Sequence, residues 1–218
     1  LPRSSNSIFL PTKEVLSLHH IILQSRELSK TFGFDDTYLD LARALRQPPK
    51  GGRNYQQFAM SRKNLSEILE GKVEYDEKLG RWQFKKGNQR FPIGVTAEGI
   101  KKISILDTLL GNRYLDQNSV IFIDEPESAL HPAAISKFLD IIAMLAECGI
   151  QFFMASHSYF VIKKLFLIAQ KKEILSIPII SVKDDSWDIA NLREGLPDNP
   201  IIDESIQLYK EEVELALQ

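Results

Sequence analysis

Two adjacent carboxylates, Asp124 and Glu125, directly follow the apolar run Val120–Ile123. Such a run predicts a strand of a parallel sheet that is buried on both faces. Because open α/β sheets bind ligands at the carboxyl ends of their strands, both carboxylates are expected at a binding edge. There Asp124 could hold Mg²⁺, directly or through water, and Glu125 could orient or deprotonate a water for attack on a phosphoryl group. The alternative is a strand that runs into a solvated acidic turn.

A histidine follows the next predicted strand. The segment Ile150–Ala155 is again apolar, and Ser156-His157-Ser158 comes directly after it. A parallel neighbouring strand would place His157 on the same sheet edge as Glu125, where an imidazole can hydrogen-bond a γ-phosphate oxygen. A purely structural role for this single histidine is the alternative.

Local patterns predict the elements that position these residues. A helix from Pro132 to Gly149 would join the two strands into a right-handed β-α-β unit. Upstream, the spacing predicts a helix over 12–30 with Thr12 as its N-cap, and a hairpin with arms at 73–75 and 82–84. The remaining predicted elements are helices near 38–45, 54–70, 97–110 and 158–171, strands near 177–182 and 187–192, and a last helix capped by Asp203.

Composition limits the class of protein. The chain has 218 residues, of which 44% are hydrophobic and 26% charged, and its net charge is -2. These values are typical of one globular core, with room for an inserted lobe. No apolar run reaches the ~18 residues of a membrane helix, and the single cysteine, Cys148, can form no internal disulfide. We therefore expect a cytoplasmic protein without a membrane partner. Because the sequence begins with Leu1 and not with Met, we also expect it to be a piece of a longer chain.

Several segments together resemble a known family. The strings Asp124–Glu127, Leu130–Pro132 and Ser156–Ser158 are similar to the Walker B, D-loop and switch-histidine segments of ABC-type ATPases, within the soluble OLD/RecF/SMC-like group of AAA-type ATP-binding proteins. Ala97–Lys102 is similar to the signature segment, and Phe9–Ser17 resembles the region after the first sheet. The resemblance implies an α/β fold of the P-loop NTPase type, with residues 12–90 as a helical lobe with a β-hairpin and 91–218 as the carboxyl-terminal α/β part of the head.

The resemblance also implies functional residues and partners. ATP and Mg²⁺ would be bound between two heads of a homodimer. Glu125 and His157 would be catalytic, and Asp124 would hold the metal. The residues implied for the signature and ATP contacts are Glu98, Gly99, Lys101 and Ser128.

Two departures from the family pattern matter. Ala97 or Glu98 stands where the signature serine would be, so the segment could also be an ordinary helix start. The sequence contains no Gly-x-x-x-x-Gly-Lys-[Ser/Thr] loop, which is the main cradle for the β- and γ-phosphates. We therefore expect the carboxyl-terminal part of an ATP hydrolase that is inactive by itself. The alternatives are a catalytically inactive, ATPase-derived scaffold that binds protein or nucleic acid and, with no acidic cluster to support it, a nuclease.

A basic stretch of the sequence suggests DNA as a further partner. Between residues 41 and 64 six cations occur without an acidic residue, and four more follow on the hairpin, which could neutralise DNA phosphates. A solvated lobe surface is the alternative, and a protein effector is a second partner left open. The cations are Arg43, Arg46, Lys50, Arg53, Arg62, Lys63, Arg81, Lys85, Lys86 and Arg90.

Overall fold

The computed structural model describes residues 5–13, 15–31, 33–49, 56–183 and 186–217. The chain divides into two units, Leu1–Ala155 and Ser156–Gln218, and each is described by itself. The fold class is α/β, as predicted, because a parallel sheet flanked by helices is combined with antiparallel hairpins. Within the described residues no helix is long and apolar enough to cross a membrane.

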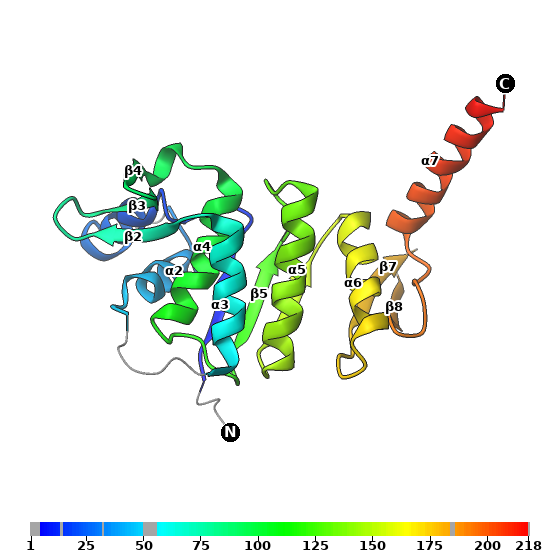
Figure 1. Ribbon diagram of the computed structural model, residues 1–218, viewed down its shortest axis with the longest axis horizontal. Helices are drawn as coiled ribbons and strands as arrows, with labels where there is room; N and C mark the ends of the chain where they lie inside the picture. Colours follow the sequence, from blue (N-terminus) through cyan, green and yellow to red (C-terminus); the bar gives the residue numbers. More distant parts are fainter. Residues whose placement is uncertain (1–4, 14, 32, 50–55, 184–185, 218) are drawn as a thin grey trace. The chain divides into compact units, whose positions relative to one another are not determined.

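A three-stranded parallel sheet forms the centre of the first unit (Figure 1). Its order is β1 (Ser7–Leu10), β5 (Val120–Asp124) and β6 (Gln151–Ala155), with Leu10 opposite Ile123 and Asp124 opposite Ala155. The strand β1 was not predicted, because four residues give too short a pattern to separate from a loop.

The prediction that 120–123 is buried on both faces was wrong. Ile121 and Ile123 are buried, but the side chain of Phe122 is 41% exposed and stacks on Phe153 of β6, with ring centroids 5.1 Å apart. Successive side chains of a strand point to opposite faces, so the covered face takes the isoleucines and the other face takes the phenylalanines.

Helices of the first unit supply its core. They are α1 (His19–Leu23) with its π-helical continuation η1 (Gln24–Leu28), α2 (Asp36–Arg46), α3 (Gln56–Leu69), α4 (Glu98–Gly111) and α5 (Pro132–Glu147). Asp35 caps α2 by accepting hydrogen bonds from the amides of Thr37 and Tyr38. The helix predicted from Thr12 begins only after Leu18, because the Thr12 hydroxyl is used elsewhere. Asn54, the predicted start of α3, lies outside the described residues.

The β-α-β unit is formed as predicted. Pro132 occupies the first turn of α5, where its missing amide costs nothing, and His131 caps the helix. Gly149 ends the connection at φ +106°, and an added Cβ would lie 2.5 Å from the carbonyl oxygen of Gln117, so only glycine fits. Cys148 is half-buried at the end of α5, and burial raises the pKa of its thiol.

A second, antiparallel sheet carries the predicted hairpin. Its strands are β2 (Lys72–Asp76), β3 (Arg81–Lys86) and β4 (Gln89–Pro92), in that order, and a short 3₁₀ turn, η2 (Ile93–Val95), follows. The Asp76 carboxylate accepts hydrogen bonds from the amides of Lys78 and Leu79, which closes the first turn. Strand β4 was not predicted. Trp82 and Phe84 are buried on one face of this sheet.

The second unit contains α6 (Tyr159–Lys171), β7 (Pro178–Lys183), β8 (Ser186–Asn191) and α7 (Pro200–Ala216). Its small core consists of buried residues from α6, α7 and the loop after β8. The last helix begins earlier than predicted, because Asn199 rather than Asp203 caps it by accepting a hydrogen bond from the amide of Ile201. The core residues are Ile162, Ala169, Leu192 and Ile202.

Candidate functional site

Strands β1 and β5 bring a hydroxyl to the first carboxylate. Asp124 is the last residue of β5, and Thr12 follows the end of the parallel neighbour β1 by two residues. The Thr12 hydroxyl donates a hydrogen bond to Asp124 Oδ2 at 2.5 Å. The two side chains are half-buried at the carboxyl edge of the sheet, so Asp124 is held in one orientation at the edge where ligands bind.

The backbone of Glu125 is fixed in an unusual conformation. Its φ is +44°, in the left-handed region, which costs a non-glycine residue about 1–3 kcal/mol. Its amide donates to the carbonyl oxygen of Ala155 at 2.9 Å, and its own carbonyl oxygen accepts from the amide of Ser128 at 3.0 Å. The surrounding hydrogen bonds therefore compensate the strain and set the direction in which the half-buried Glu125 side chain leaves the strand.

A buried lysine, Lys102 of α4, supports the same turn. Lys102 is only 5% exposed. Its ammonium group donates a hydrogen bond to the carbonyl oxygen of Glu125 and another, at 3.4 Å, to the carbonyl oxygen of Asp124. Burial lowers the pKa of Lys102, whereas the carboxylates of Glu127, Asp124 and Glu125 act in the opposite direction. No role was predicted for Lys102. The available signal was a lysine on the apolar face of a predicted helix.

The proposed signature segment packs against the turn that follows β5. Gly99 is buried, and a Cβ at this position would lie 2.4 Å from Leu130 Cδ2 and 3.3 Å from the carbonyl oxygen of Ala129. Ser128, which is half-buried, lies in the same turn. The structure therefore brings Gly99 and Ser128 onto the segment that carries Asp124 and Glu125.

Glu98 and Lys101 form an ion pair within α4. Lys101 Nζ lies 2.6 Å from Glu98 Oε1, and the side chain of Lys101 is only 3% exposed. Glu98 is half-exposed at the first turn of the helix, where a negative charge interacts favourably with the helix dipole. The positive charge of Lys101 is thus already balanced within the chain.

His157 belongs to the second unit. It is exposed and lies between the end of β6 and Ser158, which caps α6 by accepting a hydrogen bond from the amide of Val161. Two residues before it, Ala155 pairs with Asp124 in the parallel register. The catalytic role of His157 stays a prediction.

Much of the basic stretch is neutralised by acidic side chains from other segments. Arg43 pairs with Glu27, Arg62 with Asp107 and Lys63 with Glu67. On the hairpin, Lys86 pairs with Glu70. Lys50 and Arg53 lie outside the described residues. The segment 41–64 therefore offers nucleic acid fewer uncompensated charges than its sequence indicated.

The oxygen donors at the sheet edge could supply some of the ligands that Mg²⁺ needs. Among the described residues no group of three or more His, Cys, Asp or Glu side chains could hold a metal ion alone. Mg²⁺ in nucleotide sites takes one or two carboxylates from the protein and its other ligands from phosphate and water. Asp124, oriented by Thr12, fits that smaller requirement.

Comparison with protein families gives one match over most of the chain. Residues 5–163 match a family described as "AAA domain, putative AbiEii toxin, Type IV TA system". That range contains Thr12, Gly99, Asp124, Glu125 and His157.

Individual proteins give weaker likenesses. A stretch of 41 residues, 19% of this chain, is 46% identical to the Old nuclease of Escherichia phage P2, and it spans 7% of that protein. The match to a solved SMC ATPase structure covers 72% of this chain and 92% of the matched chain, at 14% sequence identity and a TM-score of 0.43. The structure of cbiO1 from Clostridium perfringens, part of an ABC transporter complex, covers 87% of this chain and 58% of its own at 14% identity and a TM-score of 0.41.

Proposed function

Because this chain belongs to the AAA domain family that its residues 5–163 match, we propose that it supplies the water-activating and Mg²⁺-binding part of an ABC-type ATPase that hydrolyses ATP between two dimerised heads. The observation that carries the proposal is the pair Asp124 and Glu125 at the carboxyl end of the central strand β5. Hydrogen bonds from Thr12 and Lys102 hold this pair.

Glu125 is the proposed general base. Its carboxylate accepts a proton from a water molecule while the water oxygen attacks the γ-phosphorus, and the bond to the β–γ bridging oxygen breaks. General-base catalysis needs a carboxylate at a fixed position, which the three hydrogen bonds around the Glu125 backbone provide. His157 is proposed to contact the γ-phosphate.

Asp124 is the proposed Mg²⁺ residue. When bound, Mg²⁺ supplies positive charge that neutralises the phosphate oxygens. The Thr12 hydroxyl donates to one carboxylate oxygen, Oδ2, and the other, Oδ1, is the proposed ligand of the ion. This division of labour gives two adjacent carboxylates different roles.

Glu98, Gly99 and Ser128 are proposed to form the face that meets the nucleotide of the partner head, with the buried Lys101 behind them as the partner of Glu98. Glu98 alone would repel a phosphate, but its bond to Lys101 Nζ holds the carboxylate and balances its charge. The phosphate would then meet the amides at the start of α4 and the hydroxyl of Ser128.

The second candidate function is a nucleotide-free scaffold that binds protein or nucleic acid. One observation favours it: Lys101, the signature-segment cation proposed for ATP, already has a carboxylate partner, Glu98, so it adds little attraction for phosphate. In that case Asp124 and Glu125 would serve only to end the strand.

Single-turnover hydrolysis separates the two functions. The measurement uses a chain that contains this domain together with a lysine-bearing phosphate loop. Glu125→Gln keeps size but removes basicity, so hydrolysis should slow by about 10²- to 10⁴-fold while ATP stays bound and dimers accumulate. Glu147→Gln, the same change on an exposed residue at the other end of α5, is the control. An unchanged rate in Glu125→Gln would leave the scaffold as the better account.

A further inference from the structure

Three cations stand in one row across the sheet β2-β3-β4. In the antiparallel register Lys72 is opposite Lys85, and Lys85 is opposite Arg90. Residues directly opposite each other share a face of the sheet, and like charges in such pairs are destabilising. A row of this kind is therefore maintained against electrostatic repulsion, which an anionic ligand would relieve.

Two of the three cations form no ion pair with a described residue, although the charge of Glu74 interacts with both. Lys72 pairs with Glu74 at 3.0 Å. Within the described part of the chain neither Lys85 nor Arg90 has a carboxylate within ion-pair distance. Lys86, the neighbour of Lys85 on the opposite face of β3, does have one, in Glu70 at 2.7 Å. The uncompensated charge is thus confined to one face.

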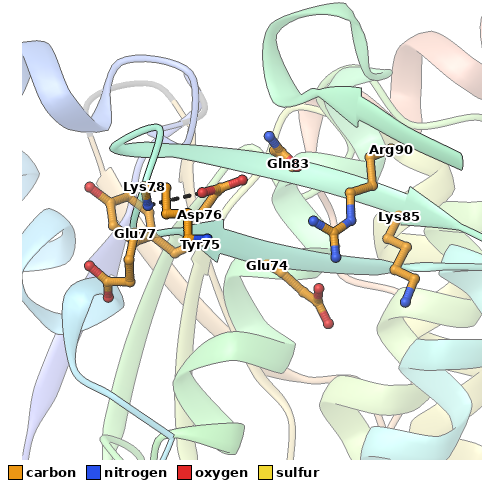
Figure 2. A pocket seen from close by; sticks show the side chains of 8 residues that line it. All are labelled: Glu74, Tyr75, Asp76, Glu77, Lys78, Gln83, Lys85 and Arg90. Carbon is orange, nitrogen blue, oxygen red and sulfur yellow. Dashed lines mark hydrogen bonds between the residues drawn. The ribbon is translucent and has the colours of Figure 1, made fainter.

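The same face is hollowed. A cavity of about 370 Å³ is lined by residues 74–78, at the end of β2 and in the turn after it, together with Gln83 and Lys85 of β3 and Arg90 of β4. Figure 2 shows Lys85 and Arg90 at one end of the cavity, and Asp76, Glu77 and Lys78 at the other. This volume lies in the range of small-ligand sites.

The basic end has donors and a positive balance. Burial leaves Gln83 only 9% exposed, and its amide makes no hydrogen bond to the described residues. The bond to Lys72, followed by the charges of Lys72, Lys85 and Arg90, lowers the pKa of Glu74, which is therefore ionised at neutral pH. Lys72 is not among the residues that line the cavity, so Lys85 and Arg90 face this one carboxylate at the basic end and leave an excess of one positive charge there.

The acidic end restricts the ligand. A carboxylate of Asp76 or Glu77 repels a second phosphate but accepts hydrogen bonds from sugar hydroxyls or base amino groups. Asp76 already accepts two backbone amides, so Glu77, which is exposed, is the freer acceptor. A ligand that fits both ends carries one phosphate next to several hydrogen-bond donors.

We propose that Lys85 and Arg90, the two cations of the row that line the cavity, bind the phosphate group of a nucleotide, either free or within a polynucleotide chain. Arg90 can bind two phosphate oxygens at once, Lys85 acts as a point charge, and Gln83, which lines the same cavity, carries an amide donor. This site lies on a different sheet from Asp124 and Glu125 and does not depend on their proposed function.

Binding measurements on the full chain test the proposal. The probes are AMP, inorganic phosphate and a short fluorescein-labelled single-stranded oligonucleotide, each at low salt. Lys85→Glu and Arg90→Glu should each weaken nucleotide binding by about tenfold or more and reduce the salt dependence of oligonucleotide binding. Lys86→Glu, which makes the same charge change on the opposite face, should alter affinity by less than about twofold.

The outcomes separate the sources of the phosphate. Binding of AMP that competes with the oligonucleotide identifies a free nucleotide, and binding of the oligonucleotide alone identifies a polynucleotide. Equal weakening by Lys86→Glu, inorganic phosphate binding as tightly as AMP, or no binding of any probe would each overturn the proposal. Thermal denaturation checks that each variant is folded. If a charge-reversal variant melts at a lower temperature than the unmodified chain, the neutral variant Lys85→Gln or Arg90→Gln replaces it.

Discussion

The ammonium group of Lys102 on α4 donates a hydrogen bond to the backbone carbonyl oxygen of Glu125, directly after the central strand. This contact joins the helix that begins with the proposed signature segment to the residue proposed as general base. It crosses 23 positions of sequence, so only the folded chain creates it.

Lys102→Met should destabilise the domain by about 1–3 kcal/mol. Methionine keeps the length of the side chain but leaves two carbonyl oxygens without their donor and three nearby carboxylates without a compensating charge. Urea denaturation measures the loss. Lys63→Met, at an exposed position of α3, should change stability by less than about 0.5 kcal/mol. Equal effects of the two changes would show that Lys102 contributes no specific contact.

Asp124→Asn should weaken the binding of Mg²⁺·ATP in a chain that also carries the phosphate loop. A neutral amide cannot balance the charge of the ion. Thr12→Val should have a smaller effect in the same direction, because it removes only the hydroxyl that orients Asp124. Titration of ATP affinity against Mg²⁺ concentration measures both. A magnesium dependence unchanged in Asp124→Asn would contradict the assignment.

The chain as given should not bind ATP tightly. It contains the two carboxylates and the segment around Gly99 but no glycine-lysine phosphate loop, so the phosphates meet more negative than positive charge. Isothermal titration calorimetry with ATP and Mg²⁺ on the Arg90→Glu variant, in which the site proposed on the sheet β2-β3-β4 is disrupted, should show no micromolar site. A micromolar site would mean that other residues of this chain replace the loop.

Gly99→Ala should lower the free energy of unfolding by about 1–3 kcal/mol, because the added methyl group overlaps Leu130 Cδ2. The double variant with Leu130→Ala should recover part of the loss, since it removes the overlapping atoms. Gly94→Ala, where a Cβ meets nothing within 4 Å, is the control. Simple additivity of Gly99→Ala and Leu130→Ala, measured by urea denaturation, would exclude this contact as the reason for glycine.

Stability should fall as the pH is lowered from about 7.5 to about 5.5. Burial lowers the pKa of His19 below its ordinary value, with Arg46 and His20 adding to the effect, so the unfolded chain binds the proton more readily. The contribution of neutral His19 is complete above the unfolded pKa of 6.5 and is lost as the pH falls toward the folded value. His19→Gln should reduce the dependence of melting temperature on pH, and exposed His20→Gln, which removes only one of the smaller causes, should reduce it less. Identical slopes for both variants would assign the pH dependence to other groups.

Local patterns in the sequence determined most of the secondary structure and the order of the motifs. The apolar run before Asp124 and Glu125, Pro132 at the start of α5 and Gly149 at its end follow from side-chain type and backbone geometry alone. For the same reason the β-α-β unit and the hairpin were predictable, since each joins segments that are close in sequence.

Only the tertiary structure decided which distant residues meet. Thr12, predicted to cap a helix, instead donates to Asp124 across 112 positions, and strand β1 exists because β5 pairs with it. Lys102 contacts Glu125, and among the described residues Lys85 forms no ion pair while Lys86 beside it pairs with Glu70. Such contacts depend on register and packing between segments far apart in the chain, which no local periodicity records.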